Sequence, residues 1–167
     1  MAATVHIEEL NGGGETATDK TSGTIRFKNA DNATVDLNNP MVVPPTSGYD
    51  YSYLKYLRLN VTGGSYTQIT NPRWYTDGSN GLGTGIEVYA KAVASYTTPV
   101  EASSVSGYTD LFTYTSGSPL DGDGNNAGPF TSTGQKGDYI VLFMRVDETA
   151  SQGIPTAESL TAAWDEI

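Results

Sequence analysis

The chain lacks cysteine, has a single histidine and contains no long run of apolar residues. Without cysteine it can build neither a disulfide scaffold nor a thiolate metal site, and it has no thiol nucleophile. The longest apolar run, residues 139–144, is far shorter than the roughly 18–20 residues that cross a bilayer as a helix, so no membrane partner is expected. The opening residues lack a charged segment followed by an apolar one, and we expect no secretory signal peptide.

Positive charge is also scarce. Nine Lys and Arg residues stand against 19 Asp and Glu residues, which gives a formal net charge of −10 at pH 7. Binding to phosphate backbones requires a cationic surface, so we expect no nucleic-acid partner. An acidic surface instead keeps a concentrated protein soluble and suits docking on a basic partner.

The residues that are abundant favour strands and turns. Threonine and the 11 tyrosines favour strands, whereas the 19 glycines and the many serines and asparagines favour turns and resist helix interiors. A chain of 167 residues is the size of one domain that can bury its own core. The composition therefore predicts a single β domain with many turns.

Alternation of apolar and polar residues locates the strands. Residues 53–61 are the clearest case, because Leu57, Leu59 and Val61 share one face. Residues 138–147 are apolar on both faces at first, which is typical of a central strand. The predicted strands cover residues 4–10, 23–28, 34–37, 53–61, 66–69, 85–93, 108–114, 138–147 and 160–166. A short helix over residues 155–164 is the alternative to the last strand.

These strands, without a long helix, predict an all-β fold: a single antiparallel β-sandwich or jelly-roll-like domain with long loops. We expect residues 1–22 to form a flexible N-terminal strand or arm, residues 23–167 to form the sandwich, and residues 116–136 to form an exposed loop. The predicted core consists of Ile25, Phe27, Leu57, Leu59, Val61, Ile86, Val88, Ile140, Leu142 and Met144.

No constellation of residues predicts catalysis, and we expect no enzyme activity. His6 alternates with apolar neighbours near the N-terminus, as a solvent-facing strand residue would, and no Gly-x-Ser-x-Gly motif accompanies it. A carboxylate pair could hydrolyse a glycosidic bond, but acids on strands and turns are ordinarily solvated. The candidates for such a pair are Glu87, Glu101, Asp138 and Glu148.

One loop carries a pattern of oxygen ligands. Asp121, Asp123 and Asn125 alternate with glycine, as calcium ligands do in an EF-hand loop. However, Asn126 stands where that loop has glycine, and Ser132 stands where it has its bidentate glutamate. We therefore interpret the segment as a hydrophilic turn and assign no metal or other cofactor, with calcium binding by these three residues as the alternative.

Aromatic residues offer a further possibility. Tyrosine and tryptophan are common on recognition surfaces, where they can stack on sugars. The candidates are Tyr49, Tyr51, Tyr53, Trp74 and Tyr75. The alternative, which we favour, is that Trp74 and Trp164 fill the ends of the sandwich core.

The order of the segments from residue 53 to residue 167 resembles that in small β-sandwich virion structural proteins of tailed phages, the capsid decoration and minor head proteins. The segments are LRLNVTGG (57–64), ITNPRWY (69–75), GTGIEVY (83–89), YTTP (96–99), GDYIVLFMRV (137–146), ASQG (150–153) and LTAAWDE (160–166). The resemblance implies a protein made in the host cytoplasm and located on the virion, at the capsid surface. It also implies binding to the major capsid protein and self-association into a homo-oligomer, but it assigns no functional residue. The alternative is a carbohydrate-binding, lectin-like module that adheres to receptor or surface glycans.

Overall fold

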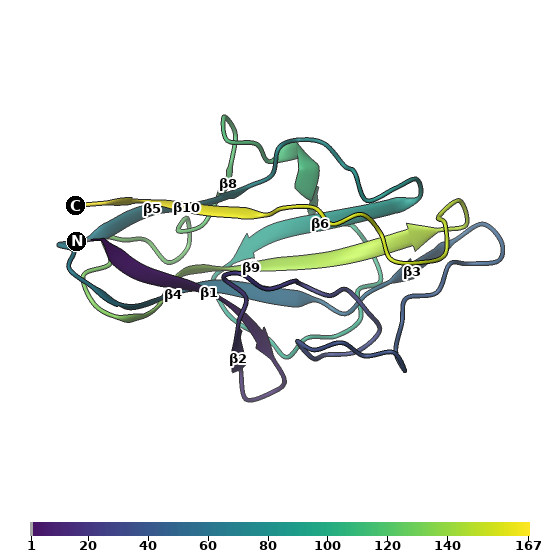
Figure 1. Ribbon diagram of the computed structural model, residues 1–167, viewed down its shortest axis with the longest axis horizontal. Coiled ribbons are helices and arrows are strands. Elements are labelled where there is room, and N and C mark those ends of the chain that lie inside the picture. Colours follow the sequence, from purple (N-terminus) through teal and green to yellow (C-terminus); the bar gives the residue numbers. More distant parts are fainter. Residues whose placement is uncertain (1) are drawn as a thin grey trace.

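The computed structural model describes residues 2–167, which form two antiparallel sheets packed face to face (Figure 1). The elements in chain order are β1 (Ala3–Asn11), β2 (Thr16–Asp19), β3 (Tyr49–Tyr51), β4 (Lys55–Gly64), β5 (Ile69–Tyr75), β6 (Ile86–Val93), β7 (Thr109–Asp110), the 3-10 helix η1 (Leu111–Thr113), β8 (Leu120–Asp121), β9 (Gly134–Asp147) and β10 (Thr161–Glu166). No helix within residues 2–167 is long and apolar enough to span a membrane. The prediction of an all-β sandwich is confirmed.

The larger sheet has the order β2-β1-β4-β9-β6-β7, and the short strand β3 pairs with β9 near the C-terminal end of β9. The smaller sheet has the order β10-β5-β8 and lies along the upper side of the view in Figure 1. The long strand β9 is central, as its apolar sequence predicts: β4 and β3 lie along one side of it and β6 along the other.

The core lies between the two sheets. Eight of the ten predicted core residues are buried, seven of them in this core, whereas Ile25 and Phe27 are half-buried and pack against it. Trp74 of β5 is also buried in this core, and Trp164 of β10 packs against it while half-buried. A second cluster, built by Leu10, Tyr56, Tyr139 and Val141, lies on the outer face of the larger sheet. The segment after β6 covers that cluster with Tyr96 and Tyr108.

Several predicted elements are wrong. Residues 23–28 and 34–37 form no strand but belong to an irregular segment, residues 20–48, that folds against the larger sheet. Residues 108–114 contain only the two residues of β7 before η1 begins. The last predicted strand is confirmed as β10, and the helical alternative is excluded because residues 161–166 pair with β5.

Of the predicted N-terminal strand or arm, residues 3–11 and 16–19 form strands of the larger sheet. β1 pairs with β4 on one side and with β2 on the other, and its last residues, Glu9, Leu10 and Asn11, are buried. Residues 3–19 are therefore an integral hairpin of the larger sheet, because β1 is paired on both sides and Val5 and Ile7 pack against the core. Similarly, the predicted loop 116–136 contains β8, whose Leu120 is buried opposite Trp74.

Candidate binding surface

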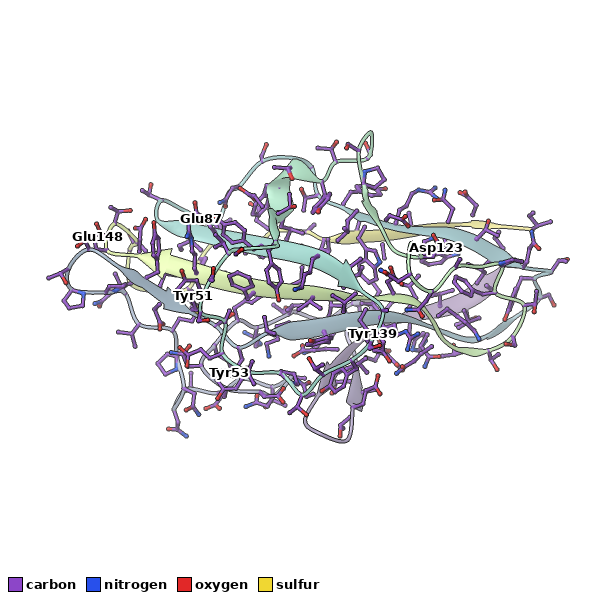
Figure 2. The ribbon with its side chains drawn as sticks, turned by 180° about the vertical axis from the view of Figure 1, so that it is seen from behind. Tyr51, Tyr53, Glu87, Asp123, Tyr139 and Glu148 are labelled. Carbon is purple, nitrogen blue, oxygen red and sulfur yellow. The ribbon has the colours of Figure 1, made fainter. Side chains whose placement is uncertain are left out.

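A group of aromatic and charged side chains gathers on the outer face of the larger sheet, where β3, β9 and β6 run side by side. Alternation along β9 directs Phe143 and Arg145 away from the core, and alternation along β6 does the same for Glu87 and Tyr89. The β3 register places Tyr51 opposite Arg145. Figure 2 shows Tyr51 and Glu87 near one end of this face and Tyr139 toward the other end.

The aromatic rings are arranged around Phe143, which is completely buried. The ring of Tyr89 stacks on it at a centroid distance of 5.5 Å and an interplanar angle of 16°. Tyr51 lies 6.1 Å from Phe143, and Tyr108 meets it edge-on at 4.9 Å. Offset-stacked and edge-on geometries are the favourable ones for aromatic pairs, so the tyrosines are held in defined positions.

Arg145 completes the group. Its guanidinium carbon lies 4.1 Å from the ring centroid of Tyr49 and 5.1 Å from that of Tyr89, so the cation lies against both rings. The same guanidinium forms an ion pair with Glu87. Burial opposes its charged form, but the hydrogen bond and charge of Glu87 outweigh burial and raise the pKa of Arg145. We call Tyr49, Tyr51, Tyr89, Phe143, Arg145 and Glu87 the Tyr–Arg patch.

Two phenols at this surface, those of Tyr89 and Tyr108, have raised pKa values. Burial and then the charge of Glu87 raise the pKa of Tyr89, and burial raises the pKa of Tyr108. Tyr49 is the most accessible member, with 51% of its surface exposed. The patch can therefore offer an aromatic surface, hydroxyl groups and a cation held by an ion pair.

The structure brings together only part of the predicted aromatic platform. Tyr49 and Tyr51 lie 6.1 Å apart in the patch, whereas Trp74 is buried in the core and Tyr75 belongs to the smaller sheet. Tyr53 forms an isolated bridge with Glu101. Glu87 was singled out from the sequence as a candidate carboxylate, whereas Tyr89, Phe143 and Arg145 were not predicted as site residues. A signal for these three was present, because the outward-facing positions of predicted strands 85–93 and 138–147 include three aromatic residues and one arginine.

The four candidate carboxylates lie in different environments. Glu87 is held by Arg145, Glu101 and Glu148 are exposed, and Asp138 is buried. Asp138 accepts hydrogen bonds from Asn125 and Asn126, through the backbone N–H and the side-chain amide of each, at 2.7–3.1 Å. It anchors the loop after β8 and is fully engaged in doing so.

That loop is the one that resembles a calcium site. Asn125 directs its amide nitrogen to Asp138, while Asp121 and Asp123 accept backbone N–H groups of the loop itself. Burial raises the pKa of Asp123, and Asp121 adds to this effect, although the hydrogen bond from Gly128 opposes it. Across residues 2–167 no group of three or more acidic or histidine side chains is arranged to hold a metal ion. The geometry is that of a self-bonded turn.

His6 lies in the β1–β2 hairpin, where its Nδ1 is 3.0 Å from Asp19 Oδ2. Both side chains are substantially exposed, at 38% and 52%. This is the solvent-facing position that the alternation predicts. The nearby hydroxyl, Thr21 Oγ1, donates to Asp19 and accepts from the Ile7 backbone, so this group is a hairpin contact.

The comparisons with known proteins add no relative. No protein-family model matches the chain, and no curated protein or solved structure is significantly similar to it.

Proposed function

We propose that this protein is a capsid decoration protein of a tailed phage, which binds the major capsid protein on the outer surface of the head and stabilises the shell. The observation that carries the proposal is the Tyr–Arg patch. Tyrosine and arginine dominate the energetic centres of protein–protein interfaces, and here stacking holds them in place before any partner arrives. Binding then loses less side-chain entropy than it would with mobile residues.

The other surface properties support adhesion. The net charge of −10 favours association with a basic partner surface. Exposed aliphatic side chains, Val35, Leu37 and Val42, lie on the segment 20–48 and add apolar contact area. Many copies on a symmetric shell would multiply such contacts into tight attachment.

Self-association is part of this proposal. β2 is an edge strand of the larger sheet, and all four of its residues are exposed. An exposed edge can add a strand from a second copy through main-chain hydrogen bonds. We therefore expect a homo-oligomer, which light scattering on a size-exclusion column would detect. A monomer at all accessible concentrations would contradict this part of the proposal.

The proposal is tested by mixing the protein with expanded heads that lack it and sedimenting the shells. The wild type should co-sediment, and Tyr49→Ala combined with Tyr51→Ala should weaken binding by at least tenfold. Tyr66→Ala, outside the patch in the turn after β4, is the matched control and should bind like the wild type. Failure of the folded wild type to co-sediment would refute the decoration role.

A second candidate function is carbohydrate binding. The half-exposed ring of Tyr49 beside the Arg145–Glu87 pair combines a stacking surface with charged hydrogen-bonding groups, the combination that sugars require. A glycan array distinguishes the two functions. A glycan signal that Tyr49→Ala abolishes, together with no binding to heads, would favour the lectin-like role.

A further inference from the structure

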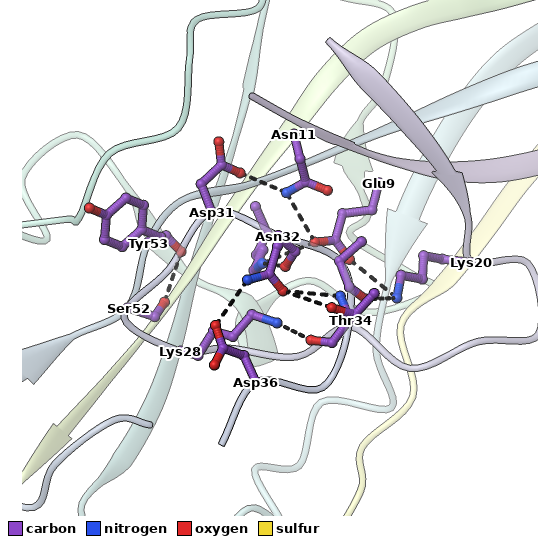
Figure 3. A network of polar contacts seen from close by, with 12 residues as sticks. Glu9, Asn11, Lys20, Lys28, Asp31, Asn32, Thr34, Asp36, Ser52 and Tyr53 are labelled. Atoms are coloured by element: carbon purple, nitrogen blue, oxygen red, sulfur yellow. Dashed lines mark hydrogen bonds and ion pairs between the residues drawn. The ribbon is translucent and has the colours of Figure 1, made fainter. Parts of the chain in front are cut away.

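A cluster of buried charged and amide side chains lies where the segment 20–48 folds over the ends of β1 and β4 (Figure 3). Glu9 and Lys55 are completely buried, and Lys28 and Asn11 are only 3% and 8% exposed. Lys20, which follows β2, also contacts this glutamate, with its Nζ 3.6 Å from Glu9 Oε2. Three lysines thus surround one glutamate in the interior of a protein that is otherwise strongly acidic.

Glu9 connects a lysine to an asparagine through a single oxygen atom. Lys55 Nζ lies 3.0 Å from Glu9 Oε1, and Asn11 Nδ2 donates to the same oxygen at 3.4 Å. The β1–β4 pairing ends at Leu10 and Tyr56, so Asn11 and Lys55 are the next residues of the two strands. Side chains that face each other in this way have Cβ atoms about 4.5–5.5 Å apart.

Two atoms of this group have no hydrogen-bond partner. Glu9 Oε2, whose nearest cation is Lys20 Nζ at 3.6 Å, and Asn11 Oδ1 are both buried without a hydrogen bond. Burying such atoms destabilises a fold, so their presence calls for a reason other than packing. Burial and then the charge of Lys55 lower the pKa of Lys28.

We propose that Lys55 and Asn11 form an intramolecular isopeptide bond, with Glu9 as the general acid–base that transfers the protons. Lys55 is the nucleophile because it shares the Glu9 oxygen with Asn11. Lys28 donates to the Thr34 carbonyl, and Lys20 donates to the Thr24 and Ala33 carbonyls. Neither contacts the Asn11 amide.

The reaction balances without any other reagent. The Lys55 ammonium gives one proton to Glu9, and the resulting amine attacks Asn11 Cγ to form the new C–N bond. A second proton leaves Nζ and reaches Asn11 Nδ2 through Glu9, the Cγ–Nδ2 bond breaks, and ammonia departs. A neutral carboxylic acid and a neutral secondary amide replace a buried ion pair and a primary amide.

The arrangement removes the obstacles that prevent this reaction in water. An exposed lysine is protonated and meets an amide only by chance, whereas here the two groups are fixed beside each other and beside a proton acceptor. The product would join β1 to β4 covalently and enclose the segment 20–48 in a closed loop.

The test is the intact mass of the purified full chain after denaturation. We expect a mass lower than that of the sequence by one molecule of ammonia, and a branched peptide joining Asn11 to Lys55 after proteolysis. Lys55→Met and Glu9→Gln should both restore the full mass. Lys28→Met is the matched control, because it removes a buried lysine of the same cluster yet should keep the mass loss. Circular dichroism verifies that each variant is folded.

Asn11 precedes Gly12, and cyclisation at this pair to a succinimide also releases ammonia. The two products differ, because a succinimide yields no branched peptide and persists in Lys55→Met. A full-length mass in the folded wild type, or a mass loss without the branched peptide, would overturn the proposal.

Discussion

Arg145 lies against Tyr49, with its guanidinium carbon 4.1 Å from the ring centroid. The two residues belong to paired strands that are almost 100 residues apart in the sequence. The contact joins the edge strand β3 to the central strand β9. The contact also holds the half-exposed ring of Tyr49 on the face of the sheet that carries the buried Phe143. The patch should therefore separate into residues that bind and residues that support the fold.

The first prediction tests this separation. Tyr49→Ala should change the free energy of unfolding by less than about 1 kcal/mol, because half of that side chain is already exposed. Phe143→Ala should cost about 3–5 kcal/mol, because it removes a completely buried ring. Urea denaturation of both variants measures the difference. Equal losses would mean that Tyr49 is a structural residue.

The second prediction concerns the core. Leu59→Ala and Leu142→Ala should each cost about 2–5 kcal/mol, because both side chains lie between the sheets with no more than 3% exposure. Leu37→Ala is the control: its side chain is 86% exposed, and a change within about 0.5 kcal/mol is expected. Chemical denaturation that shows less than half a kcal/mol for both core variants would contradict the assignment.

The third prediction concerns the loop after β8. Adding a chelator or calcium should leave the melting temperature unchanged. The Asn125 amide is already bonded to Asp138, and Asp121 and Asp123 already accept N–H groups of the loop. Thermal unfolding followed by fluorescence measures this directly. A fall of many degrees with chelator would show that Asp121, Asp123 and Asn125 hold a structural cation.

The fourth prediction concerns pH. Hydrogen bonds from Asn71 and then Arg73 lower the pKa of Asp165 below its ordinary value of 3.8. A carboxyl group with a lowered folded-state pKa stabilises the protein above that ordinary value, and this contribution is lost as the pH falls through the folded-state pKa. Stability should therefore decline below pH 3.8, and Asp165→Asn should make the decline shallower.

Asn71→Gly provides a second test of this pH effect. Asn71 has a φ of 53°, a left-handed conformation that glycine adopts freely, so the variant removes the amide donor without straining the backbone. It should also make the acid decline shallower. An unchanged slope in both variants, measured by denaturation across pH 2–6, would refute this role of Asp165.

The amino-acid sequence alone determined the fold class and most of the core. Alternation is a local property, and it reports which face of a strand is buried whatever that strand pairs with. Leu57, Leu59 and Val61 could therefore be assigned correctly before their neighbours were known. The same rule failed for Ile25 and Phe27, because a half-buried irregular segment can show the same alternation as a strand.

Only the tertiary structure decided which strands became neighbours, and with them both proposed sites. Placing β3 and β6 beside β9 brings Tyr49, Tyr89 and Arg145 together, and folding the segment 20–48 over β1 buries Glu9 and Lys55. These contacts join residues far apart in the chain. These contacts form because the strands bury their apolar faces together, and that burial sets the strand order for the whole domain. No short stretch of sequence therefore predicts which strands become neighbours.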